Sequence, residues 1–307
     1  MLLDEVNHNA VKCNELKKPF SKLIEKRSDW GEYGKILLKY IDKGELKKCG
    51  KYVFLEEADE KNFFRELLLT TTNGRMPELL CRYTSAKSFY LCLQNGFRIS
   101  SVEVMNDELE TKVIDEYPNL QSVQTELSDY LFNGFLLSFS KIERKDKLLQ
   151  WYMYGDQAKG ICFTIEPKND KDVFWAPVVY VPKKLETNDQ TLLNFLNELL
   201  GVKIDNQYSF KLRYWHYWKY FFKYDFYQEE EEVRMLIIQK DNGSTDWSEE
   251  FRTPYHYISR KREDIPFVIK SVMFGPRYHN TDNFQNYISE LLGNLIEMSH
   301  SVIIGYR

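Results

Sequence analysis

A run of four glutamates leads directly into an apolar, β-branched segment, and this junction constrains the fold more than any other stretch. Glu229 to Glu232 are followed by Val233-Arg-Met-Leu-Ile-Ile, a composition typical of a buried strand. Side chains alternate between the two faces of a strand, so we expect Glu230 and Glu232 to share one face and Glu231 to take the other. Such a run is ordinarily a solvated loop, and the alternative is a paired-carboxylate active site at the mouth of the strand.

Composition and charge narrow the class of protein. The chain has 307 residues, 43% of them hydrophobic, and a net charge of −4, as expected of an ordinary packed protein. This charge argues against a protein that coats nucleic acid or a membrane surface, although a local basic groove stays open. There is no apolar run of membrane-spanning length and no signal-peptide core, so we expect a cytoplasmic protein without membrane contact. The five cysteines and five histidines lack metal-ligand spacing, so no metal is expected.

Hydrophobic periodicity predicts an α+β protein. Apolar residues recur at helical spacing through residues 1–75, which indicates a helical N-terminal accessory region; it can cover a cleft, bind a regulatory partner or stabilise the core. The polar, turn-rich segment 70–77 suggests the boundary to a second domain, 76–307. In that domain short buried strands are expected near residues 79–83, 97–100, 135–140, 161–165, 175–181, 233–238, 269–277 and 301–307. Helices are expected at residues 86–95, 148–154, 188–222 and 280–292.

Three short motifs in the second domain combine residue types that suit chemistry on a dinucleotide. They are Arg82-x-Thr84 at a strand end, Ser138-x-Ser140 at a strand end, and Glu230-x-Glu232 at a strand start. An arginine can hold a diphosphate through paired charge-assisted hydrogen bonds. A carboxylate can bind a ribose hydroxyl and stabilise the oxocarbenium-like charge of a breaking glycosidic bond. A second carboxylate can orient or deprotonate the acceptor.

The order of these motifs resembles the arginine–serine–glutamate arrangement of mono-ADP-ribosyltransferases. A longer string, from Arg82-Tyr-Thr-Ser through Ser138-Phe-Ser, Trp151-x-x-Tyr-Gly and Glu230-x-Glu-Val-Arg to Val272-Met-Phe-Gly-Pro, is similar to a bacterial family called domain of unknown function 2971. That second resemblance covers roughly residues 79–278 and excludes the N-terminal helices. The middle transferase motif is Ser-Phe-Ser here where Ser-Thr-Ser is usual.

The resemblance implies a split, mixed or antiparallel β-sheet with flanking helices, and NAD as a substrate. It implies a cytoplasmic bacterial ADP-ribosyltransferase-like enzyme, with a role as a toxin or phage-defence effector among the expectations. The acceptor would be a protein or a nucleic acid. Residues that the resemblance implies as catalytic are Glu232, Glu230 and Arg82, the last also clamping the cofactor phosphates. Those that it implies as cofactor-binding are Arg82, Tyr83, Thr84, Ser138, Ser140, Trp151 and Tyr154, with the three aromatic rings stacking on nicotinamide or adenine.

Other interpretations remain open from the residues alone. Arg234, on the same face of its strand as Glu232, can simply pair with it. The cleft can belong to a non-catalytic module that senses a nucleotide or another ligand. The segment 208–223 interleaves aromatic residues with Lys211, Arg213 and Lys219, a mixture that suits base stacking beside phosphate neutralisation. It therefore supports a nucleic-acid-acting effector, or else a helix wedged between layers.

Overall fold

The chain folds into two compact units, and each unit is assembled from three separate stretches of sequence. The computed structural model describes residues 10–102, 112–126, 133–182, 191–239, 246–248, 255–261, 263–279, 281–293 and 296–303. Unit 1 comprises Met1–Arg75, Asn106–Phe132 and Ala176–Phe226, and unit 2 comprises Met76–Met105, Asn133–Trp175 and Tyr227–Arg307. The first division falls at the polar turn around residue 75. The later segments of unit 1 group with the N-terminal residues, not with the rest of 76–307.

Unit 1 combines helices with a small mixed sheet. Its helices are α2 (Lys17–Glu25), α3 (Gly31–Lys43), α4 (Glu57–Thr71), α6 (Pro118–Glu126), α8 (Leu192–Gly201) and α9 (Trp215–Trp218). Its strands are β1 (Val11–Lys12), β2 (Leu46–Cys49), β3 (Tyr52–Leu55), β9 (Val179–Val181), β10 (Lys203–Ile204), β11 (Tyr208–Phe210) and β12 (Phe222–Tyr224). Strands β1, β2, β3, β11 and β10 form one sheet in that order, with β3 and β11 parallel. Helices α2 and α3 thus precede strands β2 and β3, which helical periodicity did not predict.

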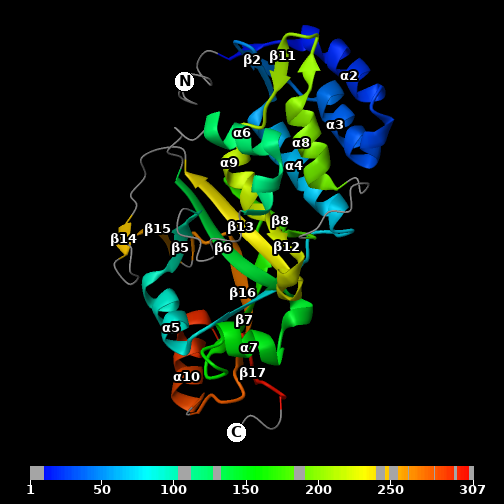
Figure 1. The fold of residues 1–307 in the computed structure, drawn as a ribbon. Helices are drawn as coiled ribbons and strands as arrows, with labels where there is room; N and C mark the ends of the chain where they lie inside the picture. Colours follow the sequence, from blue (N-terminus) through cyan, green and yellow to red (C-terminus); the bar gives the residue numbers. More distant parts are fainter. Residues whose placement is uncertain are drawn as a thin grey trace. The chain divides into compact units, whose positions relative to one another are not determined.

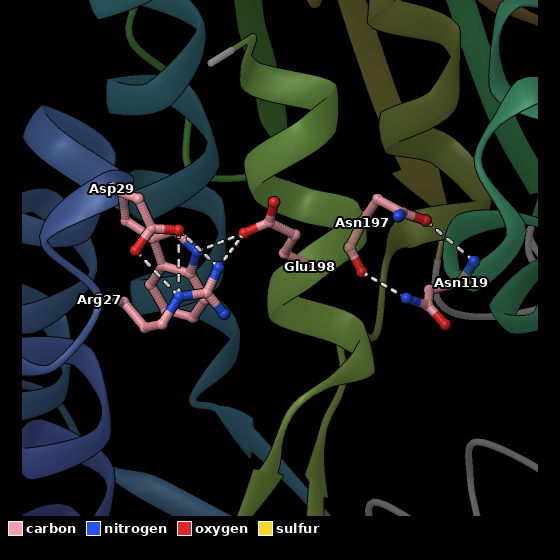
Figure 2. A network of polar contacts seen from close by, with 6 residues as sticks. Arg27, Asp29, Asn119, Asn197 and Glu198 are labelled. Atoms are coloured by element: carbon pink, nitrogen blue, oxygen red, sulfur yellow. Dashed lines mark hydrogen bonds and ion pairs between the residues drawn. The ribbon is translucent and has the colours of Figure 1, made fainter. Parts of the chain in front are cut away.

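Helix α8 ties two parts of unit 1 together through polar side chains on its sides. Glu198 accepts hydrogen bonds from the Arg27 guanidinium and from Trp30 Nε1, the latter at 2.8 Å. The preceding residue, Asn197, accepts a bond from the Asn119 backbone amide at its side-chain Oδ1 (2.9 Å) and a bond from Asn119 Nδ2 at its backbone carbonyl oxygen (2.8 Å). Figure 2 shows the two sets of contacts on either side of the helix. These long-range bonds join residues near 27, 119 and 198, so they fix segments that are distant in sequence.

The aromatic and basic segment 208–223 lies in the interior of unit 1. Three of its four cations are buried, Arg213 at 7% exposed, Lys219 at 6% and Lys223 at 4%, and Lys211 is half-buried. The buried carboxylate of Glu60 accepts bonds from the backbone amides of Arg213 and Tyr214, at 3.0 and 2.9 Å, and from Trp218 Nε1 at 3.0 Å. Burial raises the pKa of Glu60, and the charge of Arg213 opposes that rise. The segment therefore packs against α4 and does not offer its rings to bases.

The helix predicted over residues 188–222 is confirmed for Leu192–Gly201 and wrong beyond Gly201, and its first residues, 188–190, lie outside the described residues. Helix α8 ends there, and strands β10 and β11 follow as an antiparallel pair. Only α9 and a 3₁₀ turn at Lys219–Phe221 are helical before β12 begins. The apolar spacing in this stretch also suits buried strands, and the parallel partner of β11, strand β3, lies far away in sequence.

Unit 2 is built on a large sheet of mixed direction with helices beside it (Figure 1). Its helices are α5 (Ala86–Asn95), α7 (Leu148–Tyr154) and α10 (Thr281–Leu292). Its strands are β4 (Leu80–Thr84), β5 (Phe97–Ser101), β6 (Asn133–Lys141), β7 (Ile161–Pro167), β8 (Val173–Pro177), β13 (Glu232–Gln239), β14 (Asp246–Ser248), β15 (Tyr255–Arg260), β16 (Phe267–Phe274) and β17 (Glu297–His300). The main order is β14-β15-β5-β6-β4-β7-β16-β17, and β13 pairs with β6 and β8. The protein is thus α+β, as predicted.

Local chemistry explains why several of these elements form where the sequence suggests. Ser85 caps α5 by accepting a bond from the Ser88 amide at 3.0 Å, and Gly96 ends the helix at a φ of 94°, a conformation that glycine adopts without strain. One face of the sheet is apolar and forms the core, with Phe139, Phe163 and Met235 at its centre. The last strand, β17, ends at His300, so the strand predicted at 301–307 is wrong for residues 301–303, and 304–307 lie outside the described residues.

Candidate active site

The predicted site residues lie in unit 2, along strands β4, β6 and β13. Strand β6 pairs antiparallel with β13 along its whole length, from Asn133 opposite Gln239 to Ser140 opposite Glu232. Figure 1 shows this pair as the long central ribbon of the unit. Along the other edge of β6, the described pairs are with β5 at residues 135–136 and with β4 at residues 140–141. Two strands therefore share one edge of β6, and the sheet opens between them beside residues 137–139.

Arg82 lies at this opening. Its Nη1 donates a hydrogen bond to the backbone carbonyl oxygen of Ser138, at the point of β6 between the two pairing segments. The guanidinium carbon lies 5.9 Å from the ring centre of Phe139, a cation–π contact. Burial lowers the pKa of Arg82, while Cys92 and the carboxylate of Glu232 raise it. Arg82 is therefore a cation fixed at the opening, and it interacts electrostatically with the carboxylate of Glu232.

Strand register puts the two serines on the face opposite to Arg82. Directly opposed residues of an antiparallel pair point to the same side, so Ser138 and Ser140 share a face with Arg234 and Glu232. Cys81 is opposite Ser140 on β4, and Arg82, the next residue, therefore emerges on the apolar face. Arg82 contacts Ser138 at the backbone carbonyl oxygen of the serine. The hydroxyl groups of Ser138 and Ser140 therefore do not hold Arg82 in place.

Glu232 and Arg234 form a buried ion pair on β13. Arg234 Nε lies 2.7 Å from Glu232 Oε1 and Arg234 Nη2 lies 3.0 Å from Oε2. The Arg234 side chain is 1% exposed and the Glu232 side chain is 6% exposed. Two parallel charge-assisted bonds of this kind fix the orientation of the carboxylate. This confirms the interpretation that Arg234 pairs with Glu232.

The expectation that Glu230 and Glu232 share a strand face is wrong. Residues Asp225–Glu230 form a 3₁₀ helix, and β13 begins only at Glu232. Glu231 links the two with a φ of 41°, a left-handed conformation that is uncommon for a residue with a side chain. The turn sends Glu230 toward helix α7, where it accepts a 2.6 Å bond from the Tyr154 hydroxyl.

Arg144 holds the other two glutamates of the run, Glu229 and Glu231. It lies in a 3₁₀ turn, Ile142–Arg144, directly after β6. Its Nη1 is 2.9 Å from Glu229 and its Nε is 2.6 Å from Glu231. The antiparallel pairing of β6 with β13 brings the residues after 141 beside those before 232. A cation after β6 was therefore the signal for this contact, and it was missed.

The three aromatic residues expected to stack on a ligand divide into two groups. Trp151 is fully buried, donates from Nε1 to Asp146 at 2.8 Å, and meets Tyr83 edge-on with ring centres 4.8 Å apart. The Tyr83 hydroxyl donates to the Arg144 carbonyl oxygen at 2.6 Å, and burial raises its pKa. Both rings are enclosed in the packing between α7 and β4. Tyr154, 46% exposed, is the one of the three with an accessible ring.

A tight turn fixes α7 against the end of β4. Three consecutive residues after the helix, Asp156, Gln157 and Ala158, have φ values of 51°, 52° and 70°, an arrangement that costs on the order of 1–2 kcal/mol per residue. A Cβ on Gly160 would lie 2.2 Å from the carbonyl oxygen of Thr84. The backbone of this turn thus packs directly on the strand that carries Arg82, with no room for a side chain.

Comparison with protein-family models, with curated proteins and with solved structures finds no match to this chain. In the described ranges, no group of three or more His, Cys, Asp or Glu residues is placed to hold a metal ion. No helix in the part of the chain that the structure describes is long and apolar enough to cross a bilayer.

Proposed function

We propose that unit 2 is an ADP-ribosyltransferase-like module that cleaves the bond between nicotinamide and ribose in NAD and transfers ADP-ribose to a macromolecular acceptor. One observation carries the proposal: three motifs far apart in sequence meet on adjacent strands. Cys81 next to Arg82, Ser140 and Glu232 occupy one line across β4, β6 and β13. Arg82 emerges on the other face of the sheet, but it lies at the opening and the charge of Glu232 acts on it. An arginine on one side of the opening, with a hydroxyl pair and a carboxylate on the other, supplies the groups that the chemistry needs.

Each group has a role in that chemistry. Arg82 binds the diphosphate as a fixed cation. Glu232 accepts a hydrogen bond from a ribose hydroxyl and stabilises the positive charge that develops at C1′ as the C1′–N bond breaks. Nicotinamide leaves with the bonding electron pair, and a nucleophile of the acceptor forms the new bond to C1′. Glu230, held by Tyr154, receives the proton that the nucleophile loses.

The ion pair with Arg234 is compatible with this role for Glu232. Each carboxylate oxygen has two acceptor sites, so pairing with Arg234 and accepting a bond from a ribose hydroxyl do not exclude each other. The two bonds from Arg234 keep the carboxylate oriented, which is what stabilisation of a developing cation requires. It is a positioning residue and not a catalytic one.

The same pair also favours a second candidate, a module that binds a nucleotide without turnover. Glu232 is 5% exposed, and a buried carboxylate already paired in two places is typical of a structural role. Such a module would be stabilised by NAD, with a shift in unfolding temperature, but would release no nicotinamide.

The full-length chain incubated with NAD tests the proposal through nicotinamide release, measured by chromatography, with water as the acceptor when no macromolecule is present. Glu232→Gln combined with Arg234→Met removes both charges, so no buried charge is left without its partner. We expect release by this double variant to fall by about 10²- to 10³-fold. Glu229→Gln is the matched control, since Glu229 belongs to the same acidic run but its side chain is 72% exposed, and it should keep the wild-type rate.

Three results would overturn the proposal. Equal release by the wild type and a folded double variant would remove Glu232 from the chemistry. An equal loss in Glu229→Gln would show that the charge of the run matters and not this carboxylate. Thermal stabilisation by NAD with no release by the wild type would establish the second candidate.

A further inference from the structure

A basic hollow lies in unit 1, on the surface between helix α2 and the strand that follows α8. It has a volume of about 580 Å³ and is lined on one side by residues 18–27 and on the other by residues 202–206. The charged lining residues are Lys18, Lys22, Lys26, Arg27, Lys203 and Asp205. The whole chain carries a net charge of −4, so five cations against one carboxylate make this a local reversal of charge.

Three lysines are the core of the hollow's charge: Lys18 and Lys22 on α2, and Lys26 at the C-cap of that helix. Lys18, Lys22 and Lys26 are four residues apart and exposed, so they form a row with steps of about 6 Å along the helix. In the described parts of the chain, no carboxylate forms an ion pair with any of the three. Like charges at this spacing repel one another, so the row is a surface that an anionic ligand would stabilise.

The neighbouring cations are already neutralised or fixed. Arg27 is paired with Asp29 and Glu198, and Lys203 donates to the Ser209 hydroxyl at 2.6 Å. The helix that carries the lysine row is itself anchored, since Phe20 and Ile24 on its other side are buried. The row is therefore held in place on a supported helix.

The shape and the apolar part of the lining indicate the kind of ligand. Pro19, Leu23 and Val202 also line the hollow, and they give a sugar or a base an apolar surface beside the cations. The volume is that of a small-ligand pocket, which suits a few nucleotides of a single strand better than the larger surface of a duplex. A bilayer surface is flat and does not enter a hollow.

We propose that this hollow binds the phosphate backbone of a single-stranded nucleic acid. The lysine row follows the strand, with successive lysines at a spacing comparable to that of successive phosphates in an extended chain. Binding is independent of base sequence, because the charged groups contact phosphates only. The site lies in unit 1 and does not depend on the chemistry proposed for unit 2.

The test is fluorescence anisotropy of a labelled 12-nucleotide oligo-dT with the full-length chain, at several salt concentrations between 20 and 200 mM. The hollow variant carries Lys18→Glu, Lys22→Glu and Lys26→Glu. Its control carries Lys87→Glu, Lys112→Glu and Lys171→Glu, three exposed lysines elsewhere with the same change in net charge.

Each phosphate contact on a single strand adds about −0.7 to the slope of log affinity against log salt. Loss of three contacts should therefore make the slope less negative by about 2, which corresponds to a roughly 100-fold weaker affinity at 0.1 M salt. The control should keep the wild-type affinity and slope. A set of Lys→Gln changes at the same three positions serves if the Glu variant does not fold, and it should show the same loss of slope.

The proposal is overturned if the wild type does not bind the strand at 20 mM salt. It is also overturned if the hollow variant keeps the wild-type slope, or if the control loses as much affinity as the hollow variant. Tighter binding to a duplex of the same length, or to vesicles containing phosphatidylserine, would assign the hollow to a different ligand.

Discussion

The buried pair of Glu232 and Arg234 gives the sharpest prediction about stability. The pair is bidentate, at 2.7 and 3.0 Å, and its side chains are 6% and 1% exposed. Removal of one member leaves the other charge buried without a partner, which costs about 3–5 kcal/mol. We therefore expect Glu232→Gln and Arg234→Met each to destabilise unit 2 by that amount.

The double variant should recover much of the loss. With both charges gone, no charge is left unpaired, so the double variant should be more stable than the sum of the single losses by at least about 2 kcal/mol. Hydrogen exchange, followed by mass spectrometry on peptides from β6 and β13, measures this locally and avoids treating a chain with two units as a two-state folder.

The control is an exposed pair in the same sheet. Lys270 on β16 is paired with Glu166 on β7, and the side chains are 44% and 49% exposed. Glu166→Gln should cost no more than about 1 kcal/mol, because water replaces the lost contact. If Glu232→Gln costs as little as Glu166→Gln, or if the double variant loses the full sum, the pair does not hold Glu232 in the way described.

Two further predictions concern packing and pH. Gly160→Ala should destabilise unit 2 by at least about 1–3 kcal/mol, since the new Cβ would lie 2.2 Å from the Thr84 carbonyl oxygen. Gly74→Ala, in unit 1, should be nearly neutral, since its Cβ would have its nearest atom at 3.4 Å. Hydrogen exchange of peptides from each unit that shows equal effects of the two changes would contradict the packing described. Burial, with a smaller effect of Lys219, lowers the pKa of His216 from 6.5 to about 4. Protonation therefore favours the unfolded chain, and the free energy of unfolding should fall by on the order of 2–3 kcal/mol as the pH drops from 6.5 toward 4. His216→Gln should remove this part of the pH dependence, and identical urea midpoints for both proteins across the range would refute it.

Local sequence signals predicted the elements that local chemistry controls. Helix α5 has the predicted bounds because Ser85 caps its start and Gly96 ends it. Helix α7 also spans the predicted residues 148–154. The strand after Glu232 and the buried strand near residues 135–140 could be read from apolar runs alone.

Other elements depend on partners that are distant in sequence. Strand β11 pairs in parallel with β3, about 150 residues away and outside the range of any local pattern. The hairpin of β2 and β3 turns at Gly50, with a φ of 56°, a glycine signal that was present and not used.

The site was predictable in its order along the chain but not in its detail. Alternation along a strand placed Glu232 beside Arg234 correctly, since both lie within β13. The same rule failed for Glu230, because Glu231 has a left-handed conformation and the extended strand begins only after it, at Glu232. The contacts of Arg144 required the register of β6 against β13, which only the folded chain supplies.

The most direct measurement of the central claim is hydrogen exchange with and without a non-hydrolysable NAD analogue at saturating concentration. If β4, β6 and the start of β13 form one binding site, peptides containing residues 80–84, 136–141 and 229–234 should gain protection together. Glu232→Gln combined with Arg234→Met should weaken the effect at 229–234, whereas Glu229→Gln should not. No protection at saturation, or protection of one of the three peptides without the others, would contradict the claim that Arg82, Ser138 and Glu232 act as one site.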